Sequence, residues 1–239
     1  MEKIYDHPTL GPVVIRKRTG LRRLSIRIDL KKRVILTIPY AVATSEGLAF
    51  LDKKSEWVKK SLDTVAQKIE KKTLFTPTTP FKTKNHNLTL VPENRDRIGV
   101  NLTDDTLYIY YPEKLDILQP EFQDFTRAVI EKTLTLEAKT ILPPLVLEIS
   151  KETNLRFKDI SIKKVKSRWG SCSALNNLNF SIYLMLLPDH LIRYVIIHEL
   201  CHSLHKNHGP KFWELLDKLT GGKAKLLAKE MRNHSTRFF

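Results

Sequence analysis

The feature that most constrains the fold is the pentapeptide His198-Glu199-Leu200-Cys201-His202. In a helix, with about 3.6 residues per turn, the first and fifth of these residues lie on one face about one turn apart. Both imidazoles can then bind the same metal ion. The apolar run Tyr194-Val195-Ile196-Ile197 leads directly into the pentapeptide and favours a helix there. We therefore expect a buried helix that carries a metal site.

A third ligand has to come from outside the pentapeptide. His205 lies three residues after His202 and on the same helical face. It is seven residues from His198, however, which is a rise of about 10 Å along a helix. Zinc–nitrogen bonds are only about 2 Å long. One ion cannot easily bind both ends of that span, so the spacing disfavours His205.

His208 escapes this limit if the helix ends near Lys206-Asn207. Asparagine tolerates the left-handed conformation that closes helices, and Pro210 cannot continue one. The chain then folds back and offers His208 from another direction. We favour His208 as the third ligand. The competing candidates are carboxylates on a later helix, Glu214 or Glu230.

Glu199 lies between the first two ligands, and its position suggests a general base. Its carboxylate can take a proton from a water molecule whose pKa zinc has lowered to about 7. Matches to this pentapeptide pattern also occur by chance in helices that bind nothing. Here the apolar lead, the third histidine and the expected helix stop between the second and third histidines favour a zinc-dependent hydrolase.

The chain is strongly basic, with 41 lysines and arginines against 26 acidic residues and a formal net charge of +15. A polyanionic partner or substrate, including nucleic acid, is consistent with this balance. A basic solvated surface without a dedicated partner is the alternative. Part of the excess lies on an expected strand pair: Arg16, Lys17, Arg18, Arg22, Arg23, Arg27, Lys31, Lys32 and Arg33.

The two cysteines, Cys172 and Cys201, are too few for a secreted disulfide framework. The first residues lack the apolar core of a signal peptide. No stretch of about 18 apolar residues occurs, so no membrane-spanning helix is expected. We expect a cytoplasmic protein with reduced thiols, in which Cys201 is a small buried residue.

The first half of the chain reads as β-rich with one long helix. Residues 11–39 alternate with period two, which predicts half-buried antiparallel strands with a turn near Asp29-Leu30-Lys31-Lys32. A helix is expected over residues 45–72. Further strands are expected at 87–91, 98–102 and 107–111.

After Pro112 the character changes to mostly helical. The predicted elements are helices at 120–140 and 144–153, strands at 160–165, 167–173 and 178–183, the metal-site helix after Pro188, and short helices at 210–219 and 223–232. The expected fold is therefore α+β, divided into a β-rich region of residues 1–115 and a hydrolase domain of residues 116–239.

Several blocks occur in a fixed order: Ser167-Arg168-Trp169-Gly170-Ser171-Cys172-Ser173, Leu178-Asn179-Phe180, Pro188, residues 194–202, Asn207-His208 and Phe212-Trp213. In these blocks the chain resembles the YgjP-like family of metal-dependent hydrolases. The first half also resembles that family, so the resemblance covers most of the chain. It implies a zincin-like metallopeptidase fold related to the SprT-like proteases, which also place a third histidine before a Gly-Pro-x-Phe stretch.

Carried over by position, the resemblance makes His198, His202 and His208 the metal ligands and Glu199 the general base. The expected cofactor is zinc.

Two further residues are candidates for substrate binding. The guanidinium of Arg168 can hold a carboxylate or a phosphate with two hydrogen bonds, or it can form a salt bridge that orients its strand. His205 can hydrogen-bond the reacting oxygen, or it can be a polar residue at a helix end.

Three functions fit these observations. The first is peptide hydrolysis, in which an extended peptide adds to the edge of residues 167–173 or 178–181 over the metal helix. The second is hydrolysis of a phosphorylated small molecule such as a nucleoside triphosphate, with basic side chains neutralising the phosphates. The third is a nucleic-acid-associated protease of SprT-like type.

Overall fold

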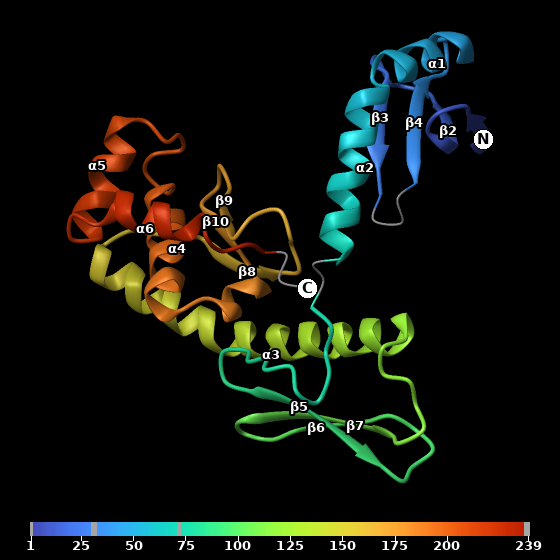
Figure 1. Ribbon diagram of the computed structural model, residues 1–239. Helices are drawn as coiled ribbons and strands as arrows, with labels where there is room; N and C mark the ends of the chain where they lie inside the picture. Colours follow the sequence, from blue (N-terminus) through green and yellow to red (C-terminus); the bar gives the residue numbers. More distant parts are fainter. Residues whose placement is uncertain (1, 30–32, 71–72, 237–239) are drawn as a thin grey trace. The chain divides into compact units, whose positions relative to one another are not determined.

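The computed structural model describes residues 2–29, 33–70 and 73–236. The chain forms two compact units, Met1–Thr73 and Leu74–Phe239 (Figure 1). The class is mixed α+β with strands concentrated in the first half, as the sequence predicts. None of the helices in the described part of the chain combines the length and hydrophobicity needed to span a bilayer.

The first unit is a four-stranded sheet with two helices. In chain order its elements are β1 (Glu2–His7), β2 (Gly11–Arg18), β3 (Ser25–Ile28), β4 (Val34–Pro39), α1 (Thr44–Lys53) and α2 (Ser55–Glu70). The strand order is β1-β2-β4-β3. The core lies between sheet and helices and includes Val13, Leu36 and Leu51, each at most 1% exposed. A side-chain carbon at Gly47 would lie 2.4 Å from Ile38 Cδ1, so glycine lets α1 approach β4 closely.

Three features of this unit differ from the sequence prediction. Strands β2 and β4 pair in parallel, whereas the β1–β2 and β3–β4 pairs are antiparallel. The expected single helix is broken at Lys54 into α1 and α2. Strand β1 was not predicted because its residues are exposed up to His7 and show no apolar alternation. The turn residues 30–32 and the expected helix end at 71–72 lie outside the described residues.

In its described residues, the second unit contains two three-stranded sheets and four α-helices. Its elements are β5 (Asn87–Glu93), β6 (Gly99–Leu102), β7 (Thr106–Pro112), α3 (Pro120–Thr153), β8 (Asp159–Lys163), β9 (Gly170–Cys172), β10 (Asn177–Ser181), the 3-10 helix η1 (Ile182–Leu186), α4 (Asp189–Cys201), α5 (Pro210–Leu219) and α6 (Ala224–Met231). The sheets have the orders β5-β7-β6 and β8-β10-β9. Helix α3 runs between the first sheet and the layer that contains the second sheet and α4 (Figure 1).

The structure divides the chain after Thr73, whereas the sequence suggested a change of character near residue 115. The reason is that the strands β5 and β7 share a core with the helices that follow. Leu90, Leu107 and Ile109 are at most 4% exposed and belong to the same buried cluster as the apolar face of α4.

Helix α3 is continuous where two helices were expected. It passes through Pro143 and Pro144, which lie half-buried and exposed on its surface. An interior proline costs a helix about 3 kcal/mol. Leu142, Val146 and Ile149 on either side are fully buried, and each such side chain contributes about 1.5–3 kcal/mol. Packing on both sides of the prolines therefore holds the helix together.

Candidate metal centre

Helix α4 brings the pentapeptide to the centre of the second unit. It begins at Asp189 after the N-cap residue Pro188, and every residue from Leu191 to Ile197 except Arg193 is buried. The helix ends at Cys201, and His202 is its C-cap residue. This end is about one turn earlier than the sequence predicted. Cys201 is fully buried, as expected for a small apolar side chain.

The early helix end is stabilised by tight turns. The N–H of Ser203 donates to the carbonyl of Leu200 at 2.8 Å, and the N–H groups of Leu204 and His205 both donate to the carbonyl of Cys201. The chain therefore reverses without the asparagine or proline that the sequence suggested. The reversal carries the backbone toward α5, which begins at Pro210.

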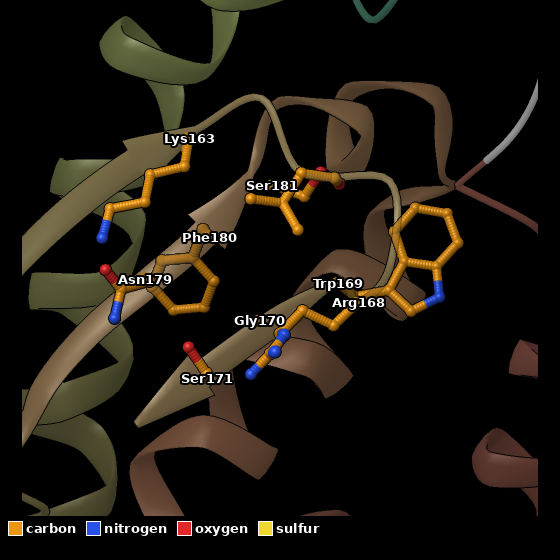
Figure 2. A pocket seen from close by; sticks show the side chains of 9 residues that line it. Lys163, Arg168, Trp169, Gly170, Ser171, Asn179, Phe180 and Ser181 are labelled. Atoms are coloured by element: carbon orange, nitrogen blue, oxygen red, sulfur yellow. The ribbon is translucent and has the colours of Figure 1, made fainter. Parts of the chain in front are cut away.

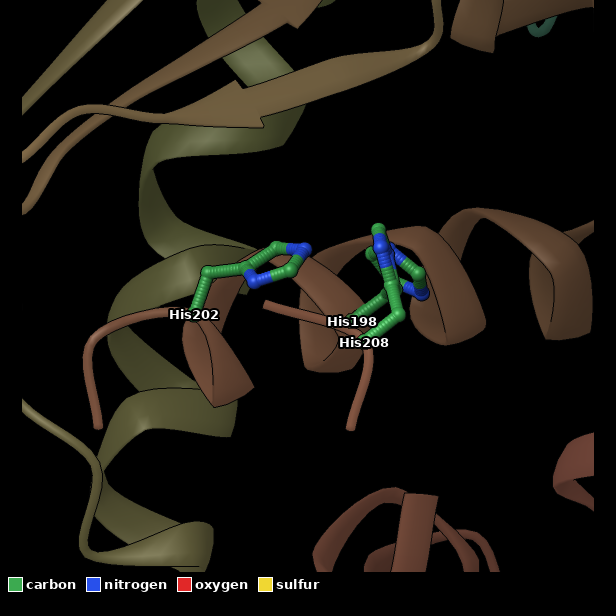
Figure 3. Close-up of side chains that lie close together, drawn as sticks. All are labelled: His198, His202 and His208. Atoms are coloured by element: carbon green, nitrogen blue, oxygen red, sulfur yellow. The ribbon is translucent and has the colours of Figure 1, made fainter. Parts of the chain in front are cut away.

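The structure brings three of the predicted site residues together. One ligand atom from each of His198, His202 and His208 lies within 4.8 Å of the other two, the only such His, Cys, Asp or Glu group found in the described residues. The Nε2 atoms of His198 and His208 are 3.0 Å apart. Two nitrogens bound to one tetrahedral zinc ion lie roughly 3.3 Å apart. The three imidazoles therefore fit a single divalent ion (Figure 3).

The other candidate ligands lie outside this group. Glu230 pairs with His190 at 2.7 Å, and Glu214 is exposed on α5. His205 contributes its backbone instead of its ring: its carbonyl oxygen lies 2.8 Å from Nδ1 of His202. This contact places the proton of His202 on Nδ1 and leaves Nε2 free to bind an ion.

One aromatic side chain supports all three histidines. Phe212 is fully buried and stacks on His202 with a centroid distance of 4.5 Å. Its ring also meets His198 at 5.0 Å and His208 at 4.7 Å, in edge contacts. Trp213 lies beside His208, with a centroid distance of 6.2 Å. The first turn of α5 thus fixes the orientation of the imidazoles.

The electrostatics keep two of the imidazoles neutral. Burial, followed by the neighbouring His202 and His208, lowers the pKa of His198 to about 3. Burial is also the largest cause that lowers the pKa of His202. A neutral imidazole is the form that binds a metal ion, so no proton has to be displaced from these two at neutral pH.

Glu199 is buried next to this group, with 7% of its surface exposed. Burial raises the pKa of its carboxyl group to about 7, and the positive charge of Arg168 opposes that rise. A carboxyl group with a pKa near neutrality can both accept and release a proton at physiological pH. This is the property that a general base requires.

Strand β9 forms a wall beside Glu199. A side-chain carbon at Gly170 would lie 2.7 Å from Cγ and 2.8 Å from Oε1 of Glu199, so any larger residue there would displace the Glu199 side chain. Strand β9 is at the end of the sheet β8-β10-β9, and no strand in the described residues pairs with its outer edge. Of the two segments expected to supply an open edge, β9 is the one at the edge near α4, and β10 is central.

Sequence reasoning missed two residues that shape this wall. Gly170 lies in the block of residues 167–173, and a glycine within a strand is a recognised sign of close backbone approach. Lys206 enters the sequence prediction only as part of the expected helix end. Its ammonium group donates to the carbonyl of Ser173 at 2.9 Å and to Oδ1 of Asn176, and so ties the loop after α4 to the β9–β10 turn. No local sequence pattern indicates these contacts of Lys206.

The family described as YgjP-like, metallopeptidase domain, matches residues 22–238. The metallopeptidase zymogen of Methanocaldococcus jannaschii jannalysin is 27% identical, with a TM-score of 0.34, over 38% of this chain and 92% of its own. That of Pyrococcus abyssi abylysin is 19% identical, with a TM-score of 0.35, over 39% and 94%. No curated protein matched.

Proposed function

This chain belongs to the YgjP-like family of metallopeptidase domains, and from that premise we propose that it is a zinc-dependent peptidase. The observation that carries the proposal is the group of His198, His202 and His208 beside the buried carboxyl group of Glu199. The three imidazoles would hold a zinc ion and leave it accessible to water or substrate. When bound, the ion lowers the pKa of a water molecule and stabilises negative charge on the attacked carbonyl oxygen.

Glu199 has the central role among the chain's own residues. It accepts a proton from the attacking water and later delivers it to the leaving amine. Burial raises the pKa of its carboxyl group to about 7 in the absence of an ion, and the positive charge of a bound ion would favour the ionised form that accepts a proton. The close approach of Gly170 limits where its side chain can lie.

The open edge of β9 provides a place for an extended peptide. Unpaired backbone groups at a sheet edge bind an added strand through main-chain hydrogen bonds. Because Gly170 of β9 lies against Glu199, a peptide on this edge has its backbone close to the general base. Among the reactions that the sequence allows, peptide hydrolysis is therefore the one that involves both the metal group and the open edge of β9.

Substitution of Glu199 by glutamine tests the proposal. Glu199→Gln should keep zinc, measured by elemental analysis, because the three histidines are unchanged. Turnover of a peptide mixture, followed by mass spectrometry, should fall by about 10²- to 10⁴-fold. Undiminished turnover by the variant would remove Glu199 from the mechanism.

A second role is favoured by the exposed arginines of the first unit. Arg18, Arg22, Arg23 and Arg27 are exposed and have no ion-pair partner among the described residues. We propose that they associate with a polyanion such as nucleic acid. Binding of labelled DNA or RNA should weaken steeply as salt rises. Replacement of these four arginines by glutamine should abolish it, and binding that survives the replacement would contradict this role.

A further inference from the structure

A small hollow lies on the outer face of the sheet β8-β10-β9 (Figure 2). Its volume is about 240 Å³, and it is lined by Lys163, Arg168, Gly170, Ser171, Asn179 and their neighbours. Pockets for drug-sized ligands have volumes of about 300–1,000 Å³. The hollow therefore suits a single side chain better than a nucleotide.

The polar groups of the hollow select for negative charge. Lys163 and Arg168 are exposed and have no ion-pair partner among the described residues, and no acidic residue lines the hollow. Ser171 and Asn179 are directly opposite each other in the β9–β10 register and add a hydroxyl and an amide donor. In Figure 2, Lys163 extends from β8 toward Asn179, and Arg168 extends along β9 toward Ser171.

The general base and this hollow lie next to adjacent residues of β9, Gly170 and Ser171. The side chains of a strand alternate between its two faces. The Cβ position of Gly170 points at Glu199, so Ser171 points to the opposite, outer face. Arg168 is nevertheless close enough to Glu199 for its charge to act on that carboxylate. The hollow and the catalytic group thus flank the same short strand.

A peptide added to the edge of β9 shows the same alternation. Every second side chain points toward the metal side, and the ones between point to the outer face. An outward side chain next to the scissile residue comes to the mouth of the hollow. Arginine holds a carboxylate with two parallel hydrogen bonds, and lysine adds a second positive charge.

We propose that the hollow is a specificity subsite that binds a carboxylate of the substrate peptide through Arg168 and Lys163. The inference rests on the proposed peptidase function, and it names the substrate class as acidic peptides. The carboxylate comes either from a glutamate or aspartate side chain or from the free C-terminus of the peptide. Both sources offer the same chemistry to the two cations.

The test uses the full-length zinc-loaded protein and short peptides in which one glutamate or glutamine is moved along the sequence. Peptides with an amidated C-terminus report on the side chain, and glutamine peptides with a free C-terminus report on the terminal carboxylate. The expected result is a preference of about tenfold or more in kcat/KM for the carboxylate peptide. In the amidated series, cleavage should be preferred when the glutamate is at every second position of the peptide.

Variants then assign the preference to the hollow. Arg168→Gln and Lys163→Gln should each reduce the preference, and Arg168→Glu should reverse it in favour of lysine peptides. Lys139→Gln, which removes an exposed charge from α3, should leave it unchanged. Equal cleavage of the glutamate and glutamine peptides, in both the amidated and the free-acid series, would overturn the proposal.

A binding measurement separates this inference from the peptidase function. The Glu199→Gln protein should bind the carboxylate peptide about tenfold more tightly than its glutamine counterpart, by fluorescence anisotropy. If no peptide is cleaved but this difference is found, the peptidase function fails and the subsite stands. If pyrophosphate competes for Arg168 and the peptides show no difference, the hollow is a phosphate site and the inference fails.

Discussion

At the scale of single residues, Gly170 sets the position of Glu199. In Gly170→Ala, the added carbon would lie 2.7 Å from Cγ of Glu199, so the glutamate side chain must move. The three atoms nearest to the added carbon all belong to Glu199, so we expect zinc content to be unchanged. Misplacement of a catalytic group by about 1 Å can lower kcat by about 10²-fold. We expect a loss of that order in peptide cleavage.

A matched glycine provides the control. At Gly209 an added carbon meets nothing within 4 Å, and the backbone has an ordinary φ of −76°. Gly209→Ala should therefore keep both zinc and most of the activity. If Gly170→Ala is as active as Gly209→Ala, β9 does not position Glu199.

Variants of His208 and His205 are expected to differ in metal retention. His208→Ala removes one of the three grouped imidazoles, so zinc should be lost on dialysis. His205→Ala should retain zinc, because residue 205 contributes its backbone carbonyl to His202 and alanine keeps that group. Zinc content of the two purified variants measures the difference. Equal retention by both would contradict the assignment of His208.

The grouping of the three histidines could be predicted from the sequence because it depends on local spacing. The spacing of His198 and His202 follows from one turn of helix, and the later His208 follows from a chain reversal. The fit of Gly170 against Glu199 could not be predicted in this way. It depends on how a distant strand packs on α4, which no periodicity encodes.

At the scale of elements, a buried carboxylate on α3 joins the layers around the site. Glu131 is 8% exposed and accepts a hydrogen bond from the hydroxyl of Tyr183 in η1 at 2.5 Å. It also pairs with Lys164 and, at 3.1 Å, with Lys166 in the loop that leads to Arg168. The network therefore fixes that loop to the long helix.

Glu131→Gln should destabilise the protein by about 1–2 kcal/mol at neutral pH, chiefly because it weakens the hydrogen bond from the hydroxyl of the fully buried Tyr183. The exposed Lys164 and Lys166 add little, because water screens the loss of their counter-charge. Burial alone would raise the pKa of Glu131, but hydrogen bonds from Lys164, Tyr183 and Lys166 outweigh it and the net pKa is lowered. The stabilisation is therefore complete above about pH 5 and is lost as the pH falls through the folded-state pKa. Urea unfolding at several pH values measures this, with Glu148→Gln on the exposed face of α3 as the control. A difference between Glu131→Gln and the native protein that does not change with pH would contradict the role of ionised Glu131.

The continuous helix α3 shows where element prediction fails. Local rules favour a break before Pro144, because a proline inside a helix removes a backbone hydrogen bond and clashes with the preceding turn. The buried residues Leu142 and Val146 on either side of the prolines pack into one core, and that packing decides the outcome. The bounds of α5, by contrast, were predicted correctly, because Pro210 marks its start and packing agrees with the local signals.

At the scale of the whole molecule, the two cores predict which fragments fold. The core of residues 13–58 and the core that begins at Phe75 share no residues. A fragment of residues 74–239 should therefore fold and bind zinc with an unfolding temperature of its own.

A fragment of residues 116–239 should fail the same test. It lacks Leu90, Leu107 and Ile109, which are buried against the helices of the second unit. At about 1.5–3 kcal/mol for each buried side chain, the loss approaches the whole stability of a typical domain, about 5–15 kcal/mol. The two fragments can be compared by their melting curves, recorded by circular dichroism, and by their zinc content. If the shorter fragment melts cooperatively at the same temperature and retains zinc, the strands β5 to β7 are dispensable and the domain begins near residue 116.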